Sequence, residues 1–176
     1  INKLDRTGAS FEKSFASILE QLTPNAVRMH IPIGEEDKHD GVIDLLSMQA
    51  YRFTGDFGAE VVAEPGSDER MTEAERRRGE LVEKIVERDD ALMERYLAGM
   101  EITVPELKRT LRRAVIAYEL VPVLAGSALK NKGIQLVLDA VIDYLPSPID
   151  VPLAEGEDPK TRERVAVETR DDAPFA

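Results

Sequence analysis

Two short motifs constrain the fold of this chain more than any other feature of its sequence. The tetrad NKLD occupies residues 2–5 and follows Ile1, which is expected to be what is left of an apolar segment; the triad SAL occupies residues 127–129 after the apolar run 121–125. Each motif precedes a stretch with helical periodicity. In doubly wound sheets, ligand-binding loops lie at the carboxyl ends of parallel strands. We therefore expect an α/β fold with a doubly wound parallel sheet.

The first motif carries side chains that suit guanine. Guanine presents two adjacent donors, N1–H and its exocyclic amino group, and the carboxylate of Asp5 can accept both in a charge-assisted pair. Adenine offers neither donor there and would leave the carboxylate without partners, which costs more than a made bond contributes. The stem of Lys3 can lie along the base plane, and the Asn2 amide can both tie the loop and reach the base edge.

The second motif relies on its backbone more than on its side chains. Small residues at 125–128 allow close approach, so that the Ala128 N–H can meet the guanine carbonyl oxygen while the Ser127 hydroxyl steadies the loop. Taken singly, each motif also fits a plainer interpretation. Residues 2–5 could be a strand-ending turn with a helix cap, and Ser127 could be an ordinary loop serine. The shared context of the two motifs favours a guanine pocket.

A wider resemblance accompanies these motifs. It is carried, in order, by residues 2–9, 32–34, 41–45, 126–135 and 143–148. Together these stretches make nearly the whole chain resemble an interior piece of the bacterial elongation factor G family of translational GTPases. The resemblance implies a partial P-loop GTPase fold, GTP or GDP as the ligand, and the ribosome as the partner of the intact protein.

The resemblance also implies the residues of the base site. They are Asn2, Lys3, Asp5, Ser127, Ala128 and Leu129. The family more often has Phe at the position of Leu129. That departure is mild, because the position supplies an apolar lid and the backbone amide comes from Ala128.

The phosphate-binding part of such a site is not in this sequence. No G-x-x-x-x-G-K-[ST] loop occurs, so nothing here would cradle phosphates or present a hydroxyl to magnesium. We expect no GTP hydrolysis by this piece, and magnesium only in the intact protein. Ile1 is expected to be the tail of a strand whose upstream neighbours have been cut away.

The elements expected from periodicity suggest a division of the chain. Residues 1–23 and 120–147 would form the rear part of the GTP-binding domain, and 24–119 an inserted α/β subdomain. Residues 148–160 would be a linker, and 161–176 the first, unpaired strand of an incomplete β-barrel domain. The expected helices are 11–22, 72–88, 91–98, 104–120 and 133–145, and the expected strands are 26–33, 41–53 (one or two), 59–64, 121–125 and 164–169.

Composition limits the partners. The net charge of −11 disfavours direct nucleic-acid binding by this piece, and the longest apolar runs are too short to cross a bilayer. The absence of cysteine excludes thiol chemistry and fits a reducing compartment, so we expect a cytoplasmic protein. His30 falls in a strand and His39 in a polar loop, with no further ligand at useful spacing, so no metal site is expected.

A basic stripe in the insert has two interpretations. It comprises Arg76, Arg77, Arg78, Lys108, Arg109, Arg112 and Arg113. In the resembled family the insert is implicated in contact with the acidic stalk protein of the large ribosomal subunit, which such arginines could meet. The plainer interpretation, which we favour, is a solvated helix surface of neighbouring ion pairs.

Two other functions stay open. One is a related ribosomal GTPase of the release-factor or tetracycline-protection type, which the insert would distinguish. The other is a protein-interaction module with an idle base pocket, which would have no preference for guanosine over adenosine.

Overall fold

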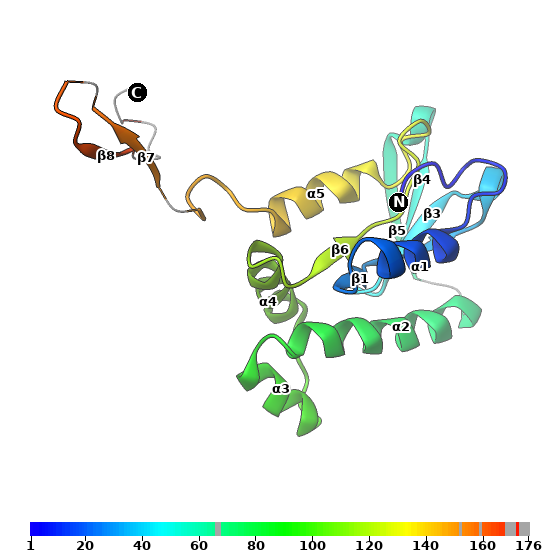
Figure 1. Cartoon of the computed structure of the whole chain (residues 1–176). Helices are drawn as coiled ribbons and strands as arrows, with labels where there is room; N and C mark the ends of the chain where they lie inside the picture. The colour runs from blue at the N-terminus through cyan, green and yellow to red at the C-terminus, as the bar shows by residue number, and fades with distance from the viewer. Residues whose placement is uncertain (66–67, 152, 159, 168–171, 173–176) are drawn as a thin grey trace. The chain divides into compact units, whose positions relative to one another are not determined.

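The computed structural model describes residues 1–65, 68–151, 153–158, 160–167 and 172. The chain divides into two compact units, Ile1–Tyr144 and Leu145–Ala176. The first unit contains both base motifs and everything between them (Figure 1). No helix in the described part is long and apolar enough to cross a membrane.

A parallel sheet supports the two base motifs. Strand β1 (Ala26–Arg28) pairs in parallel with β6 (Val121–Val123). On the opposite edge of the β6 segment, the Ile1 nitrogen donates to Leu124 O at 2.7 Å and Gly126 N donates to Ile1 O at 3.1 Å. The expected α/β architecture with a parallel sheet is thus confirmed.

Helix α1 (Phe11–Gln21) follows the first motif as expected. Its cap is Ser10, whose Oγ accepts a hydrogen bond from Lys13 N at 3.3 Å. The helix covers an unusual buried cation, Arg28 of β1, which is only 8% exposed. The Arg28 guanidinium bonds both carboxylate oxygens of Glu12 and lies 5.1 and 4.9 Å from the ring centres of Phe11 and Phe15.

The expected single strand over residues 26–33 is wrong. Met29 divides it into β1 and β2 (His30–Ile33), which belong to different sheets. Met29 N donates to Val123 O in the parallel sheet, while Met29 O accepts from Leu45 N in the other. Apolar patterning does not reveal this change because the chain stays extended and buried on both sides of Met29.

The second sheet is antiparallel, in the order β2, β3 (Gly41–Asp44), β4 (Gln49–Thr54), β5 (Glu60–Glu64). The expected turn near Ser47 and the pairing of 59–64 are confirmed. Short 3-10 turns connect its strands at one end: η1 (Glu36–Lys38) follows β2, and η2 (Asp56–Gly58) follows β4. The segments at these two turns contact the loops that carry the base motifs.

Helices α2 (Asp68–Val86), α3 (Asp90–Leu97) and α4 (Val104–Ile116) follow the antiparallel sheet in the chain. Helix α2 runs beneath α1 and β1 in Figure 1 and buries the expected stripe, including Leu81 and Ile85. Helix α4 ends at residue 116, four residues earlier than expected. The chain reverses there through Tyr118, which has a φ of 60°, and Glu119 N bonds back to Ala114 O.

Helix α5 (Ile134–Tyr144) forms where a helix is expected. Its expected apolar side is only partly covered within the described residues, since Leu138 is 60% and Ile142 76% exposed. The residue that it buries is Tyr144, which joins the main core.

The second unit contains a hairpin of β7 (Ala154–Glu157) and β8 (Arg164–Val167). The expectation of an irregular linker through residues 154–157, followed by an unpaired strand, is therefore wrong. Asp158 accounts for the turn: its Oδ1 accepts from Lys160 N and Thr161 N, and its own N–H donates to Glu163 O. The end of the expected strand, 168–169, lies outside the described residues.

Candidate functional site

The two base motifs meet beyond the carboxyl end of β6, where Ile1 bonds Leu124 and Gly126. We call residues 2–8 the first loop and residues 126–133 the second loop. Ser127 Oγ donates a hydrogen bond to Asp5 Oδ1 at 2.5 Å, and Ala128 N donates to Asn2 Oδ1 at 2.9 Å. Leu4 N also donates to Gly126 O at 3.3 Å. The structure thus brings four of the six expected site residues into direct contact across more than 120 residues of sequence.

Asp5 is held in its ionised form. The hydrogen bond from Ser127 lowers the pKa of the Asp5 carboxyl below its usual value, and the nearby Lys130 acts in the same direction. A carboxylate has about four acceptor positions, of which Ser127 occupies one. The remaining positions leave Asp5 able to accept two further donors side by side.

The other expected residues lie at the surface of the loops. Lys3 is exposed and has a φ of 66°, in the left-handed region. Its N–H donates to Asn2 Oδ1 at 2.7 Å, so Asn2 ties the first loop internally as well as to the second. Leu129 is 81% exposed beside them. Neither side chain contacts Asp5 in the described structure by any hydrogen bond or ion pair.

The floor of the site comes partly from the antiparallel sheet. Leu4, the variable residue of the NKLD tetrad, is 4% exposed and belongs to a small apolar cluster with Val42, Phe53 and Ala125. His39 was expected in a polar loop, but it is completely buried. Sequence reasoning missed this floor because a strand pattern shows that a residue is buried without showing what it is buried against.

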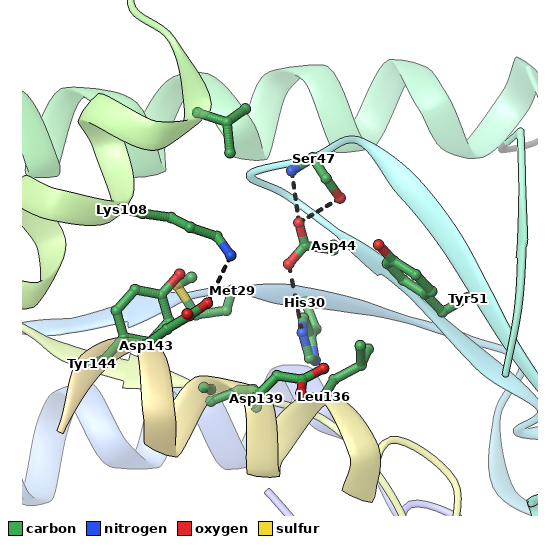
Figure 2. A pocket seen from close by; sticks show the side chains of 13 residues that line it. Met29, His30, Asp44, Ser47, Tyr51, Lys108, Leu136, Asp139, Asp143 and Tyr144 are labelled. Atoms are coloured by element: carbon green, nitrogen blue, oxygen red, sulfur yellow. Dashed lines mark hydrogen bonds and ion pairs between the residues drawn. The ribbon is translucent and has the colours of Figure 1, made fainter.

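A second hollow lies between the antiparallel sheet and helices α4 and α5 (Figure 2). His30 accepts from Ala125 N through Nδ1 at 3.3 Å, and its Nε2 lies 3.8 Å from Asp44 Oδ2. Ser47 donates to Asp44 from both its N–H and its hydroxyl. Burial lowers the pKa of His30, which keeps the imidazole neutral. Ser47 bonds the carboxylate rather than the imidazole, so the group is not a nucleophile activated by a base.

No group of three His, Cys, Asp or Glu side chains in the described ranges is arranged to hold a metal ion.

The basic stripe is largely engaged within the chain. Arg76 and Arg77 pair with Glu73 and Glu80 on α2, as neighbouring ion pairs on a helix do. Arg78 instead donates to the backbone carbonyls of residues 45 and 46. Three cations of α4 bind groups on other elements. Lys108 pairs with Asp143, Arg112 donates to the carbonyls of Ile142 and Asp143, and Arg113 pairs with Asp89.

Comparison with known proteins settles the family. The model of the elongation factor Tu GTP-binding domain family matches residues 1–147. This chain belongs to that family. Members bind guanine nucleotide, and the parallel sheet, the loops at its carboxyl edge and the α/β composition agree with a partial P-loop GTPase fold.

A solved structure has the same fold over most of the chain. It is a crystal structure of the Thermus thermophilus protein ttk003000868, is 30% identical in sequence and gives a TM-score of 0.74. The similarity covers 85% of this chain and 22% of that chain. This member of the GTP-binding family therefore spans about a fifth of the length of the protein that it matches.

Proposed function

We propose that this chain supplies the guanine-recognising rear part of the GTP-binding domain of a ribosomal translocation GTPase of the elongation factor G type. The observation that carries the proposal is the hydrogen bond between Ser127 and Asp5, which joins the two motifs at one edge of a parallel sheet. In the intact protein, GTP binding and hydrolysis would drive movement of tRNA and mRNA on the ribosome, in the cytoplasm.

The residues present fit a guanine base. Asp5 would accept from N1–H and the exocyclic amino group, because its carboxylate keeps acceptor positions beyond the one that Ser127 uses. Lys3 would cover one face of the base with its stem, and Leu129 would act as an apolar lid. The Ala128 N–H would approach the carbonyl oxygen of the base. The Ala128 N–H already donates to Oδ1 of Asn2. The guanine oxygen would therefore either accept from the same N–H together with Asn2 or take the place of Asn2 as its acceptor.

The rest of the chain has proposed roles in the same protein. Residues 1–23 and 120–147, together with β1, would belong to the GTP-binding domain, the rest of 24–119 to an inserted subdomain, and the hairpin of β7 and β8 to the beginning of a β-barrel domain. A contact of the insert with the acidic stalk protein of the large ribosomal subunit is the alternative to the solvated helix surface that we favour for the basic stripe. Because most cations of the basic stripe already pair within the chain, Arg109, for which the structure gives no ion pair, is the best candidate for that contact. Phosphate and magnesium would be bound by segments other than this one.

A series of nucleosides tests the base assignment directly. Guanosine offers Asp5 both donors, inosine keeps N1–H but lacks the amino group, and adenosine offers neither. We expect saturation-transfer NMR with the whole chain to give affinities in the order guanosine, inosine, adenosine, with the guanosine dissociation constant in the range of about a millimolar, because the phosphates contribute nothing here. Equal responses to all three nucleosides would support an interaction module with an idle pocket instead.

A further inference from the structure

The turn end of the antiparallel sheet contacts both base loops. Gly8 N, in the first loop, donates to Glu36 Oε1 of η1 at 2.7 Å. Lys132 Nζ, in the second loop, donates to the backbone carbonyl of His39, directly after η1, at 2.5 Å. One short segment, η1 and the residue that follows it, therefore holds both loops through residues only three apart in sequence.

The second turn makes a backbone contact of its own. Gly58 closes η2 with a φ of 62°, and a Cβ at that position would lie 2.9 Å from Lys130 O and 3.2 Å from Asn131 O. Real side chains do not approach carbonyl oxygens so closely, so the contact requires glycine. Gln135 Nε2 then donates to Gly58 O at 3.0 Å. The backbone of η2 thus lies directly against the second loop.

Buried side chains fill the space behind these contacts. His39 is completely buried, and its ring is close enough to Asp5 and Lys132 for their charges to affect its pKa. Leu4 packs in the cluster that includes Val42 and Phe53 of the sheet. Two contacts consequently hold the first loop: the apolar packing of Leu4 and the hydrogen bond from Gly8 N to Glu36.

From these contacts we infer that Glu36 and Lys132 are positioning residues for guanine. The inference rests on the proposed function of the two loops and deepens it. Glu36 fixes Gly8, three residues after Asp5, and Lys132 fixes the second loop four residues after Ala128. Recognition of a base by paired hydrogen bonds is sensitive to displacements of about 1 Å. The antiparallel sheet is therefore a structural part of the base pocket.

Two substitutions distinguish the effect of the hydrogen bond that Glu36 accepts from the effect of its negative charge. Glu36→Ala removes the acceptor for Gly8 N, whereas Glu36→Gln keeps an amide oxygen at the same place. Glu35→Ala is the matched control, because Glu35 is the exposed neighbour and its side chain makes no hydrogen bond in the described structure. We expect Glu36→Ala to weaken guanosine binding about fivefold, Glu36→Gln to restore most of it, and Glu35→Ala to leave it unchanged.

Variants of Lys132 provide a second, independent test of the positioning role. Lys132→Met keeps the apolar stem and removes the ammonium, and Lys38→Met is its control, an exposed lysine of η1 with no side-chain partner given by the structure. We expect Lys132→Met to weaken guanosine binding by a similar factor and Lys38→Met to have no effect. Urea unfolding of every variant checks that the free energy of unfolding does not account for the difference.

Amide hydrogen exchange gives a readout that needs no nucleoside. Glu36→Ala should speed exchange at the Gly8 amide at least about tenfold, and Glu36→Gln should not. If wild type discriminates guanosine from adenosine but Glu36→Ala binds and exchanges like wild type, the positioning role is overturned while the proposed function stands. If wild type shows no discrimination, the proposed function fails, and the Gly8 exchange rates still decide whether Glu36 holds the loop.

Discussion

The hydroxyl of Ser127 lies 2.5 Å from Oδ1 of Asp5, although 122 residues separate them in sequence. Ser127 is completely buried, whereas Asp5 is partly exposed. The serine thus orients the carboxylate from behind and leaves its outer side open. This arrangement can present two acceptor positions to a planar ligand without leaving a buried charge unpaired.

Removing the Ser127 hydroxyl should raise the pKa of Asp5. The hydrogen bond from Ser127 is the largest cause of the lowered pKa, so in Ser127→Ala the value should move up toward 3.8, that of an ordinary aspartate. A lowered carboxyl pKa stabilises the fold above the unfolded-state pKa, and this is lost as the pH falls through the folded-state pKa. Carboxyl-carbon NMR titration measures the shift directly. An unchanged Asp5 pKa in Ser127→Ala would contradict the assignment of that hydrogen bond.

Substitutions of Asp5 should change which base is preferred. Asp5→Ala removes both acceptors and should abolish the preference for guanosine while leaving the fold intact, because Asp5 is not buried. Asp5→Asn replaces one acceptor by a donor, which suits xanthine, whose C2 oxygen stands where guanine has its amino group. We expect Asp5→Asn to bind xanthosine at least as well as guanosine in the same NMR assay. Retention of guanosine preference in Asp5→Ala would exclude the carboxylate from base recognition.

The buried Arg28 should make its exposed partner important for stability. Glu12→Ala leaves the guanidinium, which is only 8% exposed, without its carboxylate, and should lower the free energy of unfolding by about 2 kcal/mol. Glu20→Ala, at an exposed position of the same helix, should change it by less than about 0.5 kcal/mol. Urea denaturation compares the two variants. Similar small effects would mean that the aromatic rings of residues 11 and 15 alone stabilise the cation.

His39 should destabilise the fold in acid. Its imidazole is completely buried, and neither ring nitrogen has a hydrogen-bond partner among the described residues. Burial, followed by the charge of Lys132, lowers the pKa of His39 below 6.5. The unfolded chain therefore takes up the proton more readily, and stability falls as the pH drops below about 6.5.

His39→Phe tests this behaviour. The variant keeps an aromatic ring and removes the unpaired nitrogens, so its free energy of unfolding should be about 1 kcal/mol higher at a pH of about 7.5. It should also lose less stability than wild type when the pH falls to about 5.5, with the remaining loss due partly to His30, whose pKa is lowered in the same direction. Identical pH dependence in wild type and His39→Phe, measured by urea denaturation, would contradict this account.

Local signals predicted most of the helices and strands. Ser10 marks the beginning of α1, helical spacing marks α2 to α5, and residues 41–53 are expected as one or two strands joined near Ser47. The strand break at Met29 was not predictable in this way, because Met29 bonds two sheets without leaving the extended conformation. The hairpin of the second unit was missed because Glu155 and Gly156 are residue types that are depleted in strands and common in loops.

The two base motifs could be found because each has a fixed spacing and a fixed context. The contacts that hold them could not. Glu36 lies in an acidic turn that is typical of a solvated surface, and no pattern links it to Gly8, 28 residues earlier. Lys132 and Gly58 are likewise ordinary loop residues until the sheet brings their segments together. Such tertiary contacts depend on topology rather than on local sequence.

Backbone amide shifts during titration with guanosine, and separately with adenosine, test the central claim most directly. The claim is that residues 2–5 and 127–129 form one guanine-selective pocket. It predicts shifts with guanosine only, grouped at Lys3, Asp5 and Ala128 and spreading to Gly8 and Lys132. Shifts of equal size with adenosine, or guanosine shifts grouped elsewhere on the chain, would contradict it.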